Sequence, residues 1–182
     1  SMRARKPAAT FVKHLERVQA AIPAGLLTPF LSNHDTGRTV GLVQGRQAVE
    51  RVKFAHGRLS LLGGSTFTYY GEEIGMRDPR YRRSELQDPV GKRYWPFNKG
   101  RDGCRSPMQW DARLDAGFSS VQPWLRTNPD YPLRNVQAQS EDPHSLYHFY
   151  KQLIQLRREN PALYAGALDL LPLENESVLV YK

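Results

Sequence analysis

The order of helical and strand patterns in the first 71 residues constrains the fold of this chain most. Apolar residues at spacings of three and four predict amphipathic helices at 8–22 and 48–62. Each helix is followed by a short apolar or β-branched run, at 26–31 and 66–70, which predicts a buried strand. Helix, strand, helix, strand is typical of a parallel α/β unit. We therefore expect an α/β fold.

Each predicted strand ends in polar residues. His34 and Asp35 follow the first strand, and Glu72 and Glu73 follow the second. In parallel α/β folds the C-terminal ends of the strands are where ligands bind. Asp35 and His34 have the hydrogen-bonding groups to hold sugar hydroxyls. An equally acceptable interpretation is that Asp35 caps the following turn and His34 packs against it.

Glu72 and Glu73 form a carboxylate pair, and glycoside hydrolysis uses two carboxylates. Adjacent residues at the end of one strand point to opposite faces, so the pair cannot flank one scissile bond. We expect a structural role for both, by pairing with arginines or capping a turn.

The periodic pattern stops between 77 and 142, a stretch rich in Pro, Gly, Asp, Arg and Trp that predicts long functional loops. Regularity returns at Asp142 and Pro143, which predict the N-cap and first position of a helix ending near Asn160. Residues 167–173 and 177–182 predict the two strands of a hairpin.

The net charge of +8 raises the question of a nucleic-acid partner. Nine basic and four acidic residues lie between 77 and 105, where they alternate with Pro, Gly and Trp without periodicity. Such a segment predicts a solvated loop, and we expect no nucleic-acid partner. The alternative would require a steep salt dependence of binding that is lost when Arg80, Arg82 and Arg83 are replaced by alanine.

No apolar run reaches the length of a membrane-spanning helix, so no membrane partner is expected. The single cysteine, Cys104, cannot form an internal disulfide, and this favours a reducing, cytoplasmic location.

The histidines outside the 32–38 segment have no second potential metal ligand at the spacing that a metal site requires. We expect no metal and no cofactor.

Taken together, these segments resemble the α-glucosidases of the α-amylase superfamily (glycoside hydrolase family 13), of the oligo-1,6-glucosidase and maltase type. The resemblance covers nearly the whole chain, in order. It is carried by residues 30–35, 69–76, 95–97, 101–111, 116–119, 123–125, 128–129, 142–146 and 156–158.

The resemblance implies the last two strand–helix units of a (β/α)8 TIM barrel, including the long loop 77–142, in residues 1–160. Residues 161–182 would begin a small all-β domain, truncated at the end of the chain. Asp35 matches the catalytic carboxylate that stabilises the transition state without attacking carbon. His34 and Arg105 match substrate-binding residues of the same subsite.

The chain departs from the family pattern at an important point. A retaining glycosidase needs a nucleophile and an acid/base about 5 Å apart, and in this family both come from earlier strands. Nothing before Phe30 resembles those segments. The chain is therefore interpreted as a fragment of an enzyme for short α-glucosides, inactive when isolated.

Two barrel strands leave open edges, so we expect pairing with another copy or with the missing barrel segment. Two alternatives stay open. One is a non-catalytic, self-associating interaction module derived from the same fold. The other is a fragment of a trehalose synthase or sucrose isomerase, enzymes that share much of this loop region.

Overall fold

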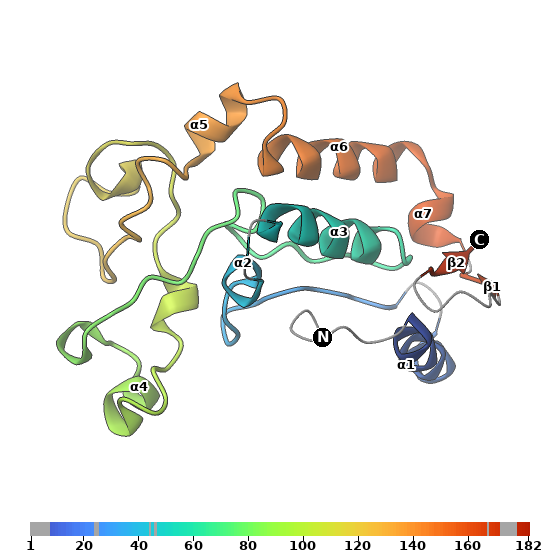
Figure 1. Cartoon of the computed structure of the whole chain (residues 1–182), viewed down its shortest axis with the longest axis horizontal. Coiled ribbons are helices and arrows are strands. Elements are labelled where there is room, and N and C mark those ends of the chain that lie inside the picture. Colours follow the sequence, from blue (N-terminus) through green and yellow to red (C-terminus); the bar gives the residue numbers. More distant parts are fainter. Residues whose placement is uncertain (1–7, 24–25, 44, 46, 167, 172–177) are drawn as a thin grey trace.

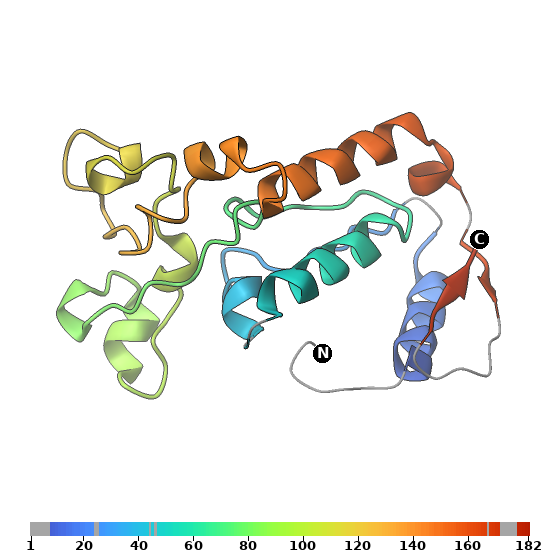
Figure 2. The same cartoon turned by 45° about the horizontal axis from the view of Figure 1, so that its top comes forward.

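The computed structural model describes the chain apart from residues 1–7, 24–25, 44, 46, 167 and 172–177. Helices α3 and α6 lie side by side in both views (Figures 1 and 2). The segment with α4 and α5 extends to one end of the molecule, and α1, α7, β1 and β2 lie at the other. The bounds of the α-helices are α1 Ala8–Ala21, α2 Thr39–Leu42, α3 Ala48–Ser60, α4 Pro89–Tyr94, α5 Val136–Glu141, α6 Leu146–Glu159 and α7 Ala162–Ala165.

The main apolar core lies between α2, α3 and α6. The apolar face predicted for 48–62 supplies Ala48 and Val52, and α3 ends two residues earlier than expected, at Ser60. Leu146 and Tyr150 of α6 meet them, with Tyr150 only 1% exposed. Burial of these faces stabilises the helix pair, because neither helix would be stable alone in water.

The helix predicted at 8–22 is confirmed as α1. Its Leu15 is buried, and the ring of Phe11 lies 4.1 Å from the guanidinium carbon of Arg58 in α3. The side-chain amide of Gln19 donates a hydrogen bond to the carbonyl of Leu168 at 2.9 Å, which ties α1 to the C-terminal segment.

The two strands predicted at 26–31 and 66–70 run parallel but form only one bridge, between Phe30 and Phe67. The N–H of Phe67 donates to the carbonyl of Pro29 at 3.0 Å, and the N–H of Ser65, just before the second strand segment, donates to the carbonyl of Leu27 at 2.8 Å. A longer ladder is limited because proline has no N–H. Within the described residues neither segment has a further strand beside it.

The predicted start of the last helix is wrong. Ser145, not Asp142, is the N-cap of α6, and its hydroxyl accepts a hydrogen bond from the N–H of His148 at 3.2 Å. Asp142 instead closes a turn, because its carbonyl accepts from the N–H of Ser145 at 3.0 Å. Pro143 therefore lies in the turn and not in the helix.

The same Asp-Pro signal does begin a helix elsewhere. Asp88 is the N-cap of α4, where its carboxylate accepts from the N–H of Val90 at 3.1 Å, and Pro89 is the first helical residue. The long loop 77–142 thus contains ordered elements. Besides α4 and α5, its short 3-10 helices are η1 Arg83–Glu85, η2 Asp102–Arg105 and η3 Leu114–Gly117.

Two small apolar clusters and several buried amides hold the loop 77–142 in place. One cluster joins Ile74, Met76 and Met108, and the side-chain amide of Asn128 donates to the carbonyl of Arg77 at 2.9 Å. The other cluster is formed by Tyr81, Leu86 and Leu125.

The predicted C-terminal hairpin is confirmed in its pairing. Strand β1 Leu170–Leu171 runs antiparallel to β2 Val180–Tyr181, with Leu170 opposite Tyr181. The expected strand residues at 167, 172–173 and 177 lie outside the described residues. None of the helices in the described ranges has the length and apolar character needed to cross a membrane.

Candidate active site

The turn after residues 26–31 presents two polar side chains to solvent. The side-chain oxygen of Asn33 accepts a hydrogen bond from the N–H of Asp35 at 2.9 Å, and the hydroxyl of Thr36 accepts from the N–H of Asn33 at 3.0 Å. Such local bonds stabilise a turn in place of a continued strand. His34 and Asp35 therefore stay 66% and 49% exposed.

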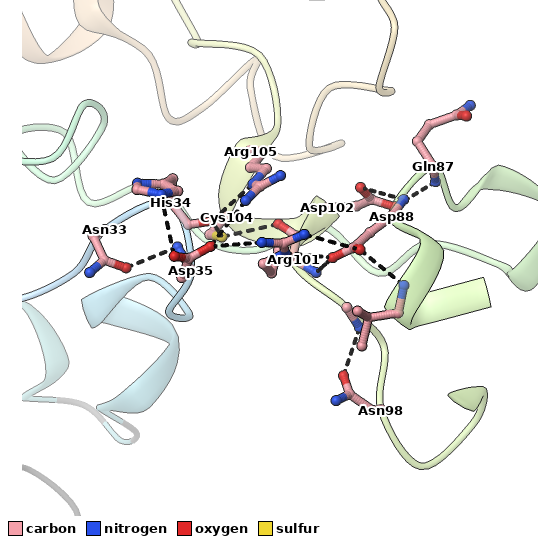
Figure 3. A network of polar contacts seen from close by, with 12 residues as sticks. Asn33, His34, Asp35, Gln87, Asp88, Asn98, Arg101, Asp102, Cys104 and Arg105 are labelled. Atoms are coloured by element: carbon pink, nitrogen blue, oxygen red, sulfur yellow. Dashed lines mark hydrogen bonds and ion pairs between the residues drawn. The ribbon is translucent and has the colours of Figure 1, made fainter. Parts of the chain in front are cut away.

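One carboxylate oxygen of Asp35 is shared by two arginines (Figure 3). Nη1 of Arg101 and Nη2 of Arg105 each donate to Oδ1 of Asp35 at 3.1 Å. Nε2 of His34 lies 3.3 Å from the other oxygen, Oδ2. The hydrogen bond from Arg101 is the main cause that holds the pKa of Asp35 below its ordinary value. This carboxylate is therefore ionised at neutral pH.

Arg101 is itself held by a buried carboxylate. Its Nε and its backbone N–H donate to Oδ2 of Asp88 at 2.9 and 2.7 Å, and these bonds lower the pKa of Asp88 to about 2. Asp102, which has no exposed surface, accepts from the N–H groups of Gln87 at 2.6 Å and Asp88 at 3.0 Å. The loop interior thereby sets the position of the arginine that contacts Asp35 (Figure 3).

Arg38 joins three segments beneath the site. It is 1% exposed, and its two terminal nitrogens donate to the carbonyls of Tyr70 at 2.6 Å and Cys104 at 3.1 Å. Its guanidinium carbon also lies 4.6 Å from the ring centroid of Tyr70. The backbone N–H of Arg38 donates to Asp78 at 3.2 Å. These contacts connect the Asp35 turn to residues 66–70 and to η2.

Among the described residues, neither Glu72 nor Glu73 forms a hydrogen bond or ion pair with His34, Asp35 or the two arginines. Glu72 is buried and accepts hydrogen bonds from the hydroxyls of Ser32 and Thr39, the latter at 3.1 Å. Burial raises its pKa, and the three bonds it accepts, including one from the N–H of Tyr69, oppose that rise. Glu72 therefore fastens the end of one strand segment to the other, which agrees with the structural role expected for it.

Of the residues singled out from the sequence, the structure brings together His34, Asp35 and Arg105. Sequence reasoning missed Arg101, although it lies in the same 101–111 stretch. No local pattern indicated it, because Arg101 lies four residues before Arg105 and residues of a 3-10 helix share a face at spacings of three. In the described part of the chain, no three His, Cys, Asp or Glu side chains are grouped so that they could hold a metal ion.

Comparison with protein families identifies a match over most of the chain. Residues 3–166 match the family described as the α-amylase catalytic domain. The oligo-1,6-glucosidase of Parageobacillus thermoglucosidasius is 38% identical over 162 residues, which cover 78% of this chain and 29% of that protein. A probable α-glucosidase of Rhizobium meliloti (strain 1021) is 37% identical over 155 residues, which cover 83% of this chain and 28% of that protein. The chain thus spans less than a third of the length of these relatives.

Solved structures to which the chain is similar also match it over about a third of their own length. The α-glucosyl transfer enzyme XgtA superposes with a TM-score of 0.85 at 33% identity, over 99% of this chain and 34% of that one. The trehalulose synthase MutB from Pseudomonas mesoacidophila MX-45 superposes with a TM-score of 0.79 at 30% identity, over 97% and 36% of the two chains. The expected partial (β/α)8 fold is confirmed.

Proposed function

Because the chain belongs to the family of α-amylase catalytic domains, we propose that it is the C-terminal part of a retaining α-glucosidase that releases terminal α-linked glucose from short oligosaccharides. The observation that carries the proposal is the Asp35 carboxylate, held at one oxygen by Arg101 and Arg105 and flanked at the other by His34. The names of the relatives, oligo-1,6-glucosidase and probable α-glucosidase, support the substrate class.

The proposed chemistry follows from the charge of this group. Glycoside cleavage passes through a transition state with positive charge on the sugar ring, and an ionised carboxylate close to the ring stabilises it. Asp35 is ionised at neutral pH, as an ordinary aspartate is, and the hydrogen bonds from the arginines extend this state to lower pH by lowering its pKa. In the proposal Asp35 grips sugar hydroxyls and stabilises this charge, while His34 and Arg105 bind the same glucose unit.

The isolated chain is proposed to be inactive. Among the described residues, the exposed site formed by His34, Asp35, Arg101 and Arg105 contains one carboxylate, that of Asp35. A retaining mechanism needs two further carboxyl groups, a nucleophile and an acid/base, about 5 Å apart. We propose that barrel segments beyond this chain supply them. In the same proposal residues 1–160 are barrel, and residues 161–182 begin the all-β domain.

The exposed strand pair supports a partner for this chain. Phe30 and Phe67 are 51% and 61% exposed, although their backbones are bridged to each other. Exposed aromatic rings beside unpaired strand edges favour association. The proposed partner is the missing barrel segment, or a second copy when that segment is absent. A monodisperse monomer at micromolar concentration in sedimentation would count against this part of the proposal.

A chimera tests the function. The chain replaces the matching segment of the Parageobacillus oligo-1,6-glucosidase, and hydrolysis of isomaltose and maltose is measured. Asp35→Asn should lower turnover by several orders of magnitude with the fold intact, because the charge is lost where the transition state needs it. The control is Asp169→Asn, whose carboxylate is 66% exposed in the C-terminal segment. A near-normal rate for Asp35→Asn would remove Asp35 from the catalytic set.

A second candidate function is transfer or isomerisation of an α-glucosyl unit, which the likeness to XgtA and MutB favours. Sequencing the gene upstream of this chain and expressing the complete reading frame would separate the two. Glucose released from maltose or isomaltose supports hydrolysis. Sucrose converted to another disaccharide without release of monosaccharides supports isomerisation.

A further inference from the structure

Beside the candidate active site, the long loop and the end of residues 66–70 line a cavity of about 460 Å³. Tyr70 lines it from the strand segment, and Trp110, Phe118 and Trp124 line it from the loop. The three loop residues are 49%, 49% and 65% exposed, and Tyr70 is 37% exposed. We call this the aromatic cavity. Large aromatic side chains gathered on one exposed surface are typical of an interaction site.

The charged side chains of the aromatic cavity already have partners within the chain. Arg105 donates to the carboxylate of Asp35 at 3.1 Å and to the carbonyl of His34 at 2.9 Å. Burial raises the pKa of Glu73, and backbone hydrogen bonds and the charge of Arg38 oppose that rise. An occupant of the cavity therefore gains little from a charged group of its own.

The accessible lining favours an apolar occupant over a sugar. Ser106 has no exposed surface, and Oε2 of Glu73 is buried. The hydroxyl of Tyr70 is engaged, because it donates to the carbonyl of Ser106 at 2.7 Å. A sugar that entered would give up hydrogen bonds to water and find few replacements. An apolar side chain loses no hydrogen bond there and gains burial against the rings.

The position of the aromatic cavity relative to the strands identifies the occupant. In a (β/α)8 barrel eight parallel strands close into a ring, so the eighth strand pairs with the first. In the proposed function residues 66–70 are the eighth strand, and among the described residues they have a strand segment, 26–31, at one edge only. Tyr70, at their C-terminal end, lines the cavity. Because the strands are parallel, the C-terminal end of the first strand comes next to Tyr70.

We propose that the aromatic cavity is the docking surface for the C-terminal end of the first barrel strand and the loop that follows it, whose apolar side chains fill the cavity. This inference rests on the proposed function, in which the chain is the last part of a larger barrel. It accounts for the exposed rings, since the chain spans only 29% of its oligo-1,6-glucosidase relative and the covering segment belongs to the remainder. Arg105 both lines the cavity and donates to Asp35, so closure of the barrel on this surface also holds the active-site arginine in place.

The test measures Tm for Trp124→Ser in two contexts, the isolated chain and the chimera with the Parageobacillus enzyme. In the chimera the variant loses an apolar contact across the interface, so its Tm should fall by roughly 3–8 °C more than in the isolated chain. The matched control is Phe97→Ser, which changes an aromatic side chain of the same loop that is 97% exposed and lies outside the cavity lining. Its effect on Tm should be the same in both contexts.

An equal effect of Trp124→Ser in both contexts would overturn the proposal. So would a higher KM for maltose in the Trp124→Ser chimera at unchanged Tm, because this would identify a sugar site. A dimeric chimera that the variant converts to a monomer would assign the cavity to a second copy and would also refute it. The readout is stability, so the difference between contexts can appear whether or not the chimera hydrolyses glucosides. Failure of this inference and failure of the proposed function are therefore distinguishable.

If the chimera does not fold, the ¹⁵N-labelled isolated chain is titrated with a synthetic peptide that has the sequence of the first barrel strand of the Parageobacillus enzyme and the loop after it. The indole N–H signals of Trp110 and Trp124 should shift, whereas that of Trp95, which lies outside the cavity lining and packs against Tyr81, should not. Trp124→Ser should bind roughly tenfold more weakly. Absence of these shifts, or equal shifts with a peptide of scrambled sequence, would contradict the proposal.

Discussion

The buried imidazole of His56 should make the stability of this chain depend strongly on pH. His56 lies on α3 with 2% of its surface exposed, and its ring stacks on Tyr150 of α6 with the centroids 3.7 Å apart. Its Nε2 lies 3.3 Å from the hydroxyl of Ser60, and the described structure places no carboxylate against the ring. Burial lowers the pKa of His56 from 6.5 to about 4.

The sign of the effect follows from proton binding. Between pH 6.5 and 4 the unfolded chain carries a proton on this histidine and the folded chain does not, so the free energy of unfolding falls as the pH is lowered through this window. A shift of this size corresponds to about 3 kcal/mol, since each pKa unit is worth about 1.4 kcal/mol. The contribution is complete above pH 6.5 and lost below pH 4.

The assay is urea denaturation, followed by far-ultraviolet circular dichroism between pH 7 and pH 4, for the wild type and His56→Phe. Phenylalanine keeps the stacked ring but cannot bind a proton. The wild type should lose about 3 kcal/mol more than the variant across this range. Equal losses would refute the reasoning, as would a His56 pKa near 6.5 from NMR titration of its ring signals.

Three further predictions concern the core and the site. Ile74→Ala should lower the free energy of unfolding by about 2–5 kcal/mol in urea denaturation, because Ile74 has no exposed surface. Ser32→Ala should lower it by about 1–3 kcal/mol, because buried Glu72 loses a donor; an unchanged midpoint would contradict this. Arg101→Ala should raise the pKa of Asp35 toward 3.8 in a carboxyl NMR titration, and an unchanged value would show that Arg101 does not hold it.

The helices could be predicted from the sequence because their signal is local. The apolar spacing at 8–22 and 48–62 matches α1 and α3 to within two residues. The start of α6 was misplaced because Asp142 and Ser145 are both good caps, and only tertiary packing decides between them. Asp88 carries the same Asp-Pro signal and does cap a helix.

The strands were less predictable because a strand depends on its neighbours. The runs at 26–31 and 66–70 have the right composition, yet the backbone forms a single bridge between Phe30 and Phe67. A strand is stabilised by neighbouring strands along its length, and among the described residues these two segments have only each other. Composition alone carries no information about which partners are present.

The site was predictable in part. The proximity of His34, Asp35 and Arg105 was implied by the family resemblance and is seen in the structure, whereas their roles stay predictions. The contact of Arg101 with Asp35 could not be derived, because it depends on how Asp88 and Asp102 fold the loop. Contacts that join positions more than 60 residues apart leave no periodic trace in a sequence.

The guanidinium group of Arg38 has a consequence for any effort to move this site into another protein. It reaches the carbonyls of Tyr70 and Cys104 from separate nitrogens while lying against an aromatic ring, a combination that the single ammonium group of lysine cannot reproduce. The turn that carries Asp35 and the loop that carries Arg101 and Arg105 are therefore held in a fixed relative position by Arg38. Either could be transplanted to a new scaffold only together with the other and with Arg38.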